Sequence, residues 1–227
     1  MHIKFFDKGA LNIALEKGFN DKIDFLYLNG EIIDYYGLSV FNKDKTRQFI
    51  KPEIDMTVNI LKEIRMTFPK IQIYYKLGNH EDRLLNFIWN KSPELTGLQC
   101  LNIENLLCFE EIGINKIESG QIAKLGKLFV AHGHEFRGTS NQINTARNIR
   151  LKAGKNNLQG HWHRTNDDFS TSVDGEVVGS YTAACLCELN PHYAPFNQWN
   201  HGFAEISIDK SGNYILDNRK IINGKIY

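Results

Sequence analysis

Histidine, asparagine and carboxylate side chains gather in a few short segments of this 227-residue sequence. The segments are Asn29-Gly30-Glu31-Ile32-Ile33-Asp34, Gly78-Asn79-His80-Glu81-Asp82-Arg83, His132-Gly133-His134 and Gly160-His161-Trp162-His163. Five of the eight histidines lie in the last three of them, so histidine is concentrated there. Imidazole, amide and carboxylate groups together are ligands for divalent transition metals, and the pattern therefore predicts a metal site.

A site for two metal ions has requirements that these residue types meet. Two divalent cations roughly 3.5–4 Å apart repel each other, so a shared carboxylate must lie between them. Imidazoles and amide oxygens then complete each shell without overneutralising the charge. His161 and His163 can both reach the ions if the loop between them turns, with Trp162 directed into packing. Gly78 and Gly160 allow the backbone to approach closely.

Each segment follows a predicted strand. Apolar runs predict strands that end at or just before the four segments, at 23–28, 71–77, 126–131 and 157–159. Apolar residues at helical spacing predict helices at 8–19 (capped by Asp7), 52–68, 83–89 and 139–153. Because open α/β sheets bind their ligands at strand ends, we expect the four segments to line one site.

The last part of the chain is typical of β structure. Asp174-Gly175 predicts a hairpin with a two-residue loop between strands at 169–173 and 176–181. A second hairpin is expected around 209–213. Strand–helix alternation followed by hairpins indicates a mixed α/β layered domain, and the length favours a single domain over residues 1–227.

Composition limits the classes of partner and compartment. The formal net charge is +1, which gives no general attraction to nucleic acid or acidic lipid, although a local basic stripe would still serve a nuclease. No stretch approaches the length of a membrane span, and no secretory signal is visible at the start, so we expect a cytoplasmic protein without a membrane partner. The spacing of the four cysteines matches no zinc or redox pattern, and Cys185 and Cys187 are expected to pack in the core.

The ordered motifs resemble those of the calcineurin-like metallophosphoesterase family. Gly-Glu-x-x-Asp at 30–34, Gly-Asn-His-Glu-x-Arg at 78–83, His-Gly at 132–133 and Gly-His-x-His at 160–163 match the family's order, from about Phe5 to His163. One motif alone is a modest pattern, but the ordered set is specific. The resemblance implies a four-layer αββα sandwich that carries a dinuclear metal site. It also implies an enzyme, a hydrolase that acts on phosphomonoester or phosphodiester substrates.

The resemblance also implies roles at the matching positions. The implied metal ligands are Asn79, His132 and His161 for one ion, and His163 with His2 for the other, with Glu31 as the bridge. The cofactors would be two divalent ions, Mn, Fe or Zn. The implied catalytic residues are His80, which would donate a proton to the leaving oxygen or steady the phosphate, and Arg83 as a supporting group. A hydroxide held by the metals would be the nucleophile.

Two departures from the family's pattern raise the alternative of a catalytically impaired binding module that retains the fold. The bridging residue is Glu31 where the family has Asp, and the extra methylene shifts the ions or their loop. Small displacements in a positioned site cost orders of magnitude in rate. The family also opens with a strand that ends in Asp-x-His. With His2 as that histidine, the Asp falls immediately before Met1 and the first strand is missing, which predicts an internal start or a gene remnant.

Other polar and aromatic residues have structural interpretations. We expect His192 and His201, in a stretch with Tyr193, Phe196 and Trp199, to pack rather than to line a substrate mouth. His134 is either a neighbour of the metal ligands or solvated, and Asp34 is expected to anchor a turn. A basic stretch favours a solvated helical face. If it contacted a phosphate backbone instead, the protein would be a nuclease of the same chemistry; its residues are Arg137, Arg147, Arg150, Lys152 and Lys155.

Overall fold

The computed structural model describes residues 1–40, 49–136 and 144–227. The chain forms two compact units. Unit 1 comprises Met1–Phe6 and Leu15–Ser119, and unit 2 comprises Asp7–Ala14 and Gly120–Tyr227. Helix α1 (Lys8–Asn20) begins in unit 2 and ends in unit 1. Its start agrees with the predicted cap, because Asp7 Oδ1 accepts from the Ala10 N–H at 2.8 Å.

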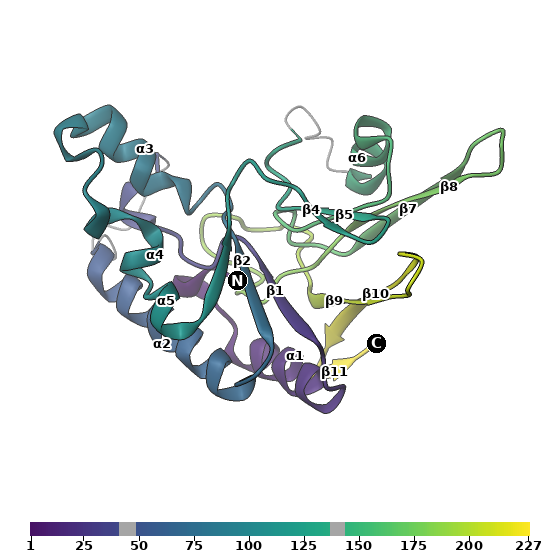
Figure 1. The fold of residues 1–227 in the computed structure, drawn as a ribbon, viewed down its shortest axis with the longest axis horizontal. Coiled ribbons are helices and arrows are strands. Elements are labelled where there is room, and N and C mark those ends of the chain that lie inside the picture. Colours follow the sequence, from purple (N-terminus) through teal and green to yellow (C-terminus); the bar gives the residue numbers. More distant parts are fainter. Residues whose placement is uncertain (41–48, 137–143) are drawn as a thin grey trace. The chain divides into compact units, whose positions relative to one another are not determined.

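Unit 1 is built around a parallel sheet with β2 at its centre (Figure 1). The strands, in sheet order, are β1 (Phe25–Asn29), β2 (Gln72–Lys76) and β3 (Ile114–Ile117). The helices are α2 (Ile50–Thr67), α3 (Asp82–Lys91), α4 (Ile103–Leu106) and α5 (Phe109–Ile112). Short 3-10 turns are η1 (Ile3–Phe5), η2 (Tyr36–Leu38), η4 (Pro93–Leu95) and η5 (Gln99–Leu101).

The core of unit 1 forms because apolar residues of the sheet and of its helices face each other. Leu61 of α2 and Phe109 of α5 pack with Tyr75 of β2 and with Ile33, which follows β1. The predicted helix over 52–68 and the predicted strands over 23–28 and 71–77 are confirmed, and each of their ends lies within two residues of its predicted position. The stretch after α3 also contains α4, α5 and β3, none of which the sequence predicted.

Unit 2 contains a five-stranded mixed sheet of order β4-β5-β6-β8-β7. Its strands are β4 (Ala123–Leu125), β5 (Leu128–Ala131), β6 (Asn157–Gln159), β7 (Asn166–Thr171) and β8 (Val177–Thr182). Strands β5, β6 and β8 run parallel, and α6 (Thr145–Ala153) packs against β7 and β8. The first residues of the helix predicted over 139–153 lie outside the described residues. The remaining helical part is confirmed.

The second sheet of unit 2 is antiparallel and has the order β11-β10-β9. It consists of β9 (His201–Ile208), β10 (Tyr214–Ile222) and β11 (Lys225–Ile226). The hairpin predicted around 209–213 is confirmed, with Asp209 Oδ1 accepting from the N–H groups of Ser211 and Asn213. The parallel and mixed sheets with their helices confirm the mixed α/β class.

The hairpin at Asp174-Gly175 differs from its prediction. The Ser172 N–H donates to the Glu176 carbonyl at 2.9 Å, and the Gly175 N–H donates to the Ser172 carbonyl at 3.0 Å. The loop therefore has three residues, and the predicted two-residue loop was wrong. The physical reason is the backbone of Gly175. It has a left-handed φ of 85° directly after a turn, and a turn followed by one left-handed residue makes a three-residue loop.

No helix in residues 1–40, 49–136 and 144–227 is both long enough and apolar enough to span a membrane. All four cysteines lie in the described part of the chain, where none forms a disulfide. Cys185 and Cys187 are buried, as predicted for core residues.

Candidate metal centre

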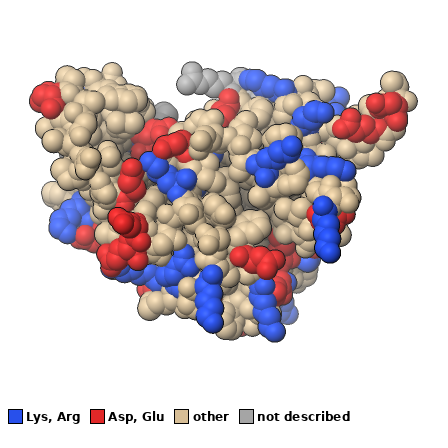
Figure 2. Space-filling view, viewed as in Figure 1, with Lys and Arg blue, Asp and Glu red and all other residues tan. Residues whose placement is uncertain are grey.

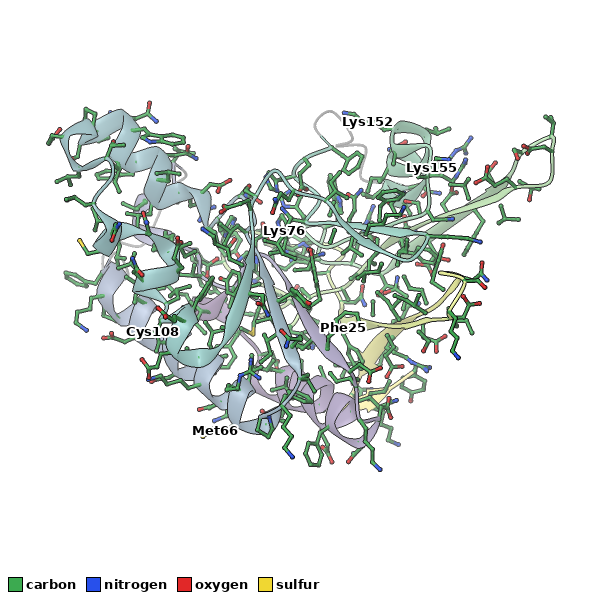
Figure 3. The ribbon with its side chains drawn as sticks, in the orientation of Figure 1. Phe25, Met66, Lys76, Cys108, Lys152 and Lys155 are labelled. Carbon is green, nitrogen blue, oxygen red and sulfur yellow. The ribbon has the colours of Figure 1, made fainter. Side chains whose placement is uncertain are left out.

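The loops that follow β1 and β2 leave the sheet of unit 1 at the same edge. Asn29 at the end of β1 pairs in parallel register with Lys76 at the end of β2 (Lys76 is labelled in Figure 3). Directly after β1, Gly30 has a φ of 76° and Glu31 a φ of 54°. Glycine adopts such left-handed angles readily, whereas for Glu31 the cost is about 1 kcal/mol. Strain of this kind at a non-glycine residue is concentrated at functional sites.

Main-chain hydrogen bonds hold His2 beside Glu31. The His2 N–H donates to the Glu31 carbonyl at 2.6 Å, and the Ile3 N–H donates to the Ile32 carbonyl at 2.8 Å. The His2 Nε2 atom then lies 3.1 Å from Glu31 Oε2. Atoms that bind one ion at about 2.1 Å lie roughly 3 Å from each other, so His2 and Glu31 are spaced as two ligands of one ion. The ligand atoms of His2, Glu31 and His80 all lie within 4.8 Å of one another.

Asp34 contacts the imidazoles of both His2 and His80. Its Oδ1 atom contacts His2 Nδ1 and lies 3.0 Å from His80 Nδ1. A carboxylate bound to one nitrogen of a metal-ligating imidazole fixes the tautomer that leaves the other nitrogen available to the ion. Asp34 was predicted as a turn anchor, and the structure shows that it also orients His2 in this way.

Arg83 determines the tautomer of His80. Its Nη2 lies 2.8 Å from His80 Nε2, and its Nη1 donates to the Asp34 carbonyl at 2.8 Å. A guanidinium only donates, so His80 Nε2 must accept and His80 Nδ1 must carry the proton that is donated to Asp34. In this arrangement His80 is a neutral, oriented imidazole whose Nε2 lone pair is directed at Arg83. Arg83 therefore acts on His80, which makes it a positioning residue.

Two opposing effects set the charge state of this cluster. Burial lowers the pKa of His2, but the negative charges of Asp34 and Glu31 outweigh burial and raise it to about 9. Burial alone would raise the pKa of Asp34, but the His2 charge and hydrogen bond dominate and hold it well below its usual range. His2 is therefore protonated at neutral pH in the metal-free chain. A metal ion must displace that proton to reach Nε2.

Glu81 ties the two loops of unit 1 together. Its Oε1 accepts from the Ile32 N–H at 2.8 Å and the Tyr75 hydroxyl at 2.9 Å. Its Oε2 accepts from the Glu31 N–H at 3.0 Å and the Gly78 N–H at 2.8 Å. Because Glu81 is almost completely buried, these bonds fix the backbone that carries the predicted ligands. Glu81 follows His80 directly in the second motif, but no pattern in the sequence predicted that it would hold the loops.

Glu53 supports the Asp34 backbone from α2. Its two carboxylate oxygens accept from the Asp34 N–H at 2.7 Å and the Tyr36 N–H at 3.2 Å. Burial, together with the nearby Asp34 charge, raises the pKa of Glu53 to about 7. Sequence reasoning missed this residue, because a glutamate in the first turn of an amphipathic helix is ordinarily solvated.

Asn79 provides the test of whether the residues of unit 1 fit a metal ion. Its Oδ1 atom is buried and has no hydrogen-bond partner among the residues that the structure describes. A buried amide oxygen without a partner costs about 1–3 kcal/mol of stability. A bound cation removes that cost, so the Asn79 side chain fits its predicted role as a ligand.

In unit 2, the loops after β5 and β6 also emerge side by side. Ala131 pairs in parallel register with Gln159, so His132 and Gly160 follow at the same edge. Gly133 has a φ of 132°, and a Cβ atom there would lie 2.8 Å from His161 Cβ and 3.3 Å from the Gly160 carbonyl oxygen. Only glycine allows these two loops to approach so closely. The rings of His132 and His161 meet with their centroids 5.1 Å apart, so two of the predicted ligands lie together.

The loop at residues 160–163 turns, as predicted. The Trp162 N–H donates to the Gly160 carbonyl at 2.6 Å, which makes a three-residue γ-turn centred on His161. His161 has a φ of 62° and His163 a φ of 58°. Trp162 packs edge to face against His161, and the His163 ring packs against Trp199 with centroids 4.2 Å apart. As at Glu31, the left-handed angles at both histidines are strained for residues other than glycine.

Glu135 fixes the loop that carries His132. Its carboxylate accepts from the Gly133 N–H at 2.7 Å and the His132 N–H at 3.3 Å. His134, half-buried, lies 3.6 Å from the same carboxylate and has its ring centroid 5.3 Å from that of His132. His134 is therefore a neighbour of the predicted ligands, which agrees with one of its two interpretations. Nothing in the sequence distinguished Glu135 from a solvated carboxylate.

The remaining histidines differ in exposure. His201 is half-buried, and its Nε2 lies 2.8 Å from the Cys187 carbonyl oxygen and 3.9 Å from Asp7 Oδ2. It packs as predicted. His192 is exposed, with its ring edge against Tyr193.

The basic stretch is divided between paired and exposed side chains. Arg150 Nε lies 2.5 Å from Asp168 Oδ2, so its charge is compensated. Arg147 is exposed on α6, as are Lys152 near the end of the helix and Lys155 just after it (the two lysines are labelled in Figure 3). Several Lys and Arg side chains also gather at the upper right of Figure 2. Arg137 lies outside the described residues. The exposed members agree with a solvated helical face.

Known proteins give no independent assignment: no protein-family model matches the chain, and no curated protein matches it in sequence.

Proposed function

We propose that this chain is a metal-dependent phosphoesterase of the calcineurin-like metallophosphoesterase type. The observation that carries the proposal is the arrangement of His2, Asp34 and Glu31. A buried carboxylate orients an imidazole whose other nitrogen lies at inter-ligand distance from a second carboxylate. This is the geometry of a carboxylate–histidine–metal site.

Two further features support the proposal. Asn79 presents a buried amide oxygen without a hydrogen-bond partner among the described residues. In unit 2, Gly133 lets the loops of His132 and His161 meet. The two ions that the resemblance implies would be Mn, Fe or Zn. When bound, such ions lower the pKa of a water molecule and neutralise charge on a phosphate.

The chain's own residues would have distinct tasks in hydrolysis of a phosphoester. His80, held by Arg83 and Asp34, would be oriented beside the substrate, where it steadies the phosphate. To donate a proton to the leaving oxygen instead, its Nε2 would first have to take up a proton in place of the hydrogen bond from Arg83. Glu81 would keep the Glu31 and Asn79 loops in register. The proposed architecture is the four-layer αββα sandwich of this family.

Metal content and hydrolysis, measured on the same variants, test the proposal. The full chain is incubated with Mn²⁺, desalted, and assayed for bound metal and for hydrolysis of bis(p-nitrophenyl) phosphate. We expect two equivalents of metal and turnover in the wild type. His161→Ala should abolish turnover, and Asn79→Ala and His132→Ala should each bind less metal than the wild type. Glu63→Ala, an exposed change on α2, serves as the control.

The same measurements separate the alternative. One equivalent of metal or none, without turnover, would support a non-catalytic module that keeps the fold. Turnover that survives His161→Ala unchanged would contradict the site assignment.

A further inference from the structure

A loop rich in aromatic residues joins the two sheets of unit 2. Residues 189–200, here called the aromatic loop, contain no Asp, Glu, Lys or Arg. Its rings are those of His192, Tyr193, Phe196 and Trp199. The prediction that this stretch packs is wrong for three of its rings. The structure shows that His192, Tyr193 and Phe196 are exposed.

The aromatic loop is braced internally. Asn197 Nδ2 donates to the Leu189 carbonyl at 2.6 Å and to the Ala194 carbonyl at 2.7 Å. Its Oδ1 accepts from the Trp199 N–H at 2.8 Å. Tyr193 and Trp199 meet with ring centroids 6.3 Å apart. The loop therefore presents its rings from a defined backbone, which lowers the entropy cost of binding a ligand on them.

Phe196 contributes little to the folding stability of the loop. Its side chain is 99% exposed, and its φ of 57° is a left-handed angle that a bulky residue rarely adopts. Folding stability therefore gains little from the ring and loses some free energy to the backbone strain. An exposed, strained phenylalanine on a braced loop indicates a binding role.

The loop adjoins residues suited to phosphate. The Trp199 ring packs on His163, a candidate metal ligand, with centroids 4.2 Å apart. The Gln198 side chain accepts from Arg164, whose other guanidinium nitrogen donates to Thr145 Oγ1 at 2.8 Å at the start of α6. A guanidinium and an imidazole thus lie beside an uncharged aromatic surface.

We infer that the aromatic loop binds the base of a nucleoside phosphoester by stacking, with Phe196 and Tyr193 as its platform. This rests on the proposed function and names its substrate class as nucleotide. A base lies one sugar away from its phosphate, and Tyr193 is separated from His163 by one ring, that of Trp199. Flat aromatic bases stack on exposed rings irrespective of sequence. An uncharged loop favours this contact over one with a further phosphate.

A matched pair of substrates isolates the contribution of the base. One is a dithymidine phosphodiester, and the other is the same phosphodiester with both bases replaced by hydrogen. The Mn²⁺-loaded full chain is compared with Phe196→Asn, which removes the ring while keeping a residue that tolerates left-handed φ. Phe196→Trp retains a ring. Phe19→Asn, at a 60% exposed phenylalanine of α1, is the control.

We expect the wild type to favour the base-containing substrate by roughly ten-fold in kcat/KM, through a lower KM. Phe196→Asn should lose most of this preference, leave turnover of the abasic substrate unchanged, and not lower the melting temperature. Phe196→Trp and Phe19→Asn should keep the preference. Equal kcat/KM values on both substrates, or a preference that persists in Phe196→Asn, would overturn the base site while leaving the phosphoesterase proposal intact.

If the chain hydrolyses neither substrate, the proposed function fails and binding alone decides the base site. Saturation-transfer NMR with thymidine monophosphate should then show transfer to the thymine protons in the wild type. This transfer should be lost in Phe196→Asn. No transfer in the wild type would overturn the inference. A short single-stranded DNA distinguishes the two sources of a base, since only a strand that also contacts Lys152 and Lys155 would bind with a steep salt dependence. Either source supports the site.

Discussion

Nδ1 of His2 contacts Oδ1 of Asp34, and both side chains are almost completely buried. This contact fixes the orientation of the imidazole and makes the neighbouring Nε2 the only ring nitrogen that faces Glu31. The two residues are far apart in sequence, and the main-chain pairing of residues 2–3 with residues 31–32 brings them together. The charge state and stability of unit 1 depend on this pair, and in the proposed function its metal affinity would depend on it as well.

Removing the charge of Asp34 should weaken metal binding. Asp34→Asn keeps the size of the side chain but loses the carboxylate that orients His2 and His80. Loss of such a partner typically weakens metal binding by about 10- to 100-fold. Calorimetric titration with Mn²⁺ measures the effect, and Asp55→Asn, an exposed change on α2, is the matched control. Equal affinities for the two variants would show that Asp34 does not orient a ligand.

The pH dependence of the metal-free chain should report the protonation of His2. The pKa of His2 is raised from 6.5 to about 9 in the folded chain, so its stabilising effect is complete below pH 6.5 and is lost as pH rises to about 9. The loss is on the order of 3 kcal/mol. Glu53 also has a raised pKa, but its effect is lost between pH 4.5 and about 7. The hydrogen bond with Cys187 lowers the pKa of Cys185 from 9.0 to about 6, so the stabilising effect of Cys185 grows over the same pH range in which that of His2 declines. The difference between the wild type and His2→Asn therefore isolates His2.

Urea unfolding at several pH values measures that decline, and it should flatten in His2→Asn. Mn²⁺ binding by the wild type should release a proton below pH 9, seen as a buffer-dependent heat, because the ion displaces the His2 proton. A binding heat that is independent of the buffer would contradict the proposed role of His2.

Glu81→Gln should destabilise the chain and disorder the two loops. One carboxylate oxygen becomes an amide group that cannot accept, so two buried donors lose their partner. At about 1–3 kcal/mol for each of the two groups, the expected loss is about 2–6 kcal/mol. Urea unfolding measures it against Glu63→Gln, an exposed glutamate of α2. A difference below about 0.5 kcal/mol, the usual range of surface substitutions, would show that Glu81 does not hold the loops.

Gly133→Ala should separate the loops of His132 and His161. Its φ of 132° and the 2.8 Å approach of a Cβ atom to His161 Cβ combine strain with a clash. Gly175→Ala, at a φ of 85° with nothing within 4 Å, adds strain alone. We expect losses of about 3 kcal/mol or more and about 1 kcal/mol respectively, with phosphoesterase turnover lost only in the former. Retained turnover in Gly133→Ala would mean that the approach of the loops is not needed.

Local patterns in the sequence identified most of the elements that carry the site. Apolar runs and helical spacing predicted β1, β2, β5, β6, α1 and α2, because burial of one face imposes a period on the chain. They failed for the short elements α4, α5, β3 and β4, which are held by tertiary packing rather than by a period of their own. The hairpin loop at Asp174-Gly175 was one residue longer than predicted, because a turn sequence does not by itself set the strand register.

The sequence by itself determined which chemical groups occur at its start and after its strands, and in what order: His2, then Glu31, Asn79, His80, His132, His161 and His163. Only the tertiary structure decided how those groups are held. Asp34 orients His2 and His80, Arg83 sets the tautomer of His80, and Glu81, Glu53 and Glu135 fix the loops. The contacts of Asp34 with His2, of Glu53 with Asp34 and of Glu81 with Glu31 join residues distant in the chain. Burial strengthens these hydrogen bonds and makes an unpaired polar group costly in free energy. Neither effect leaves a local pattern in the sequence.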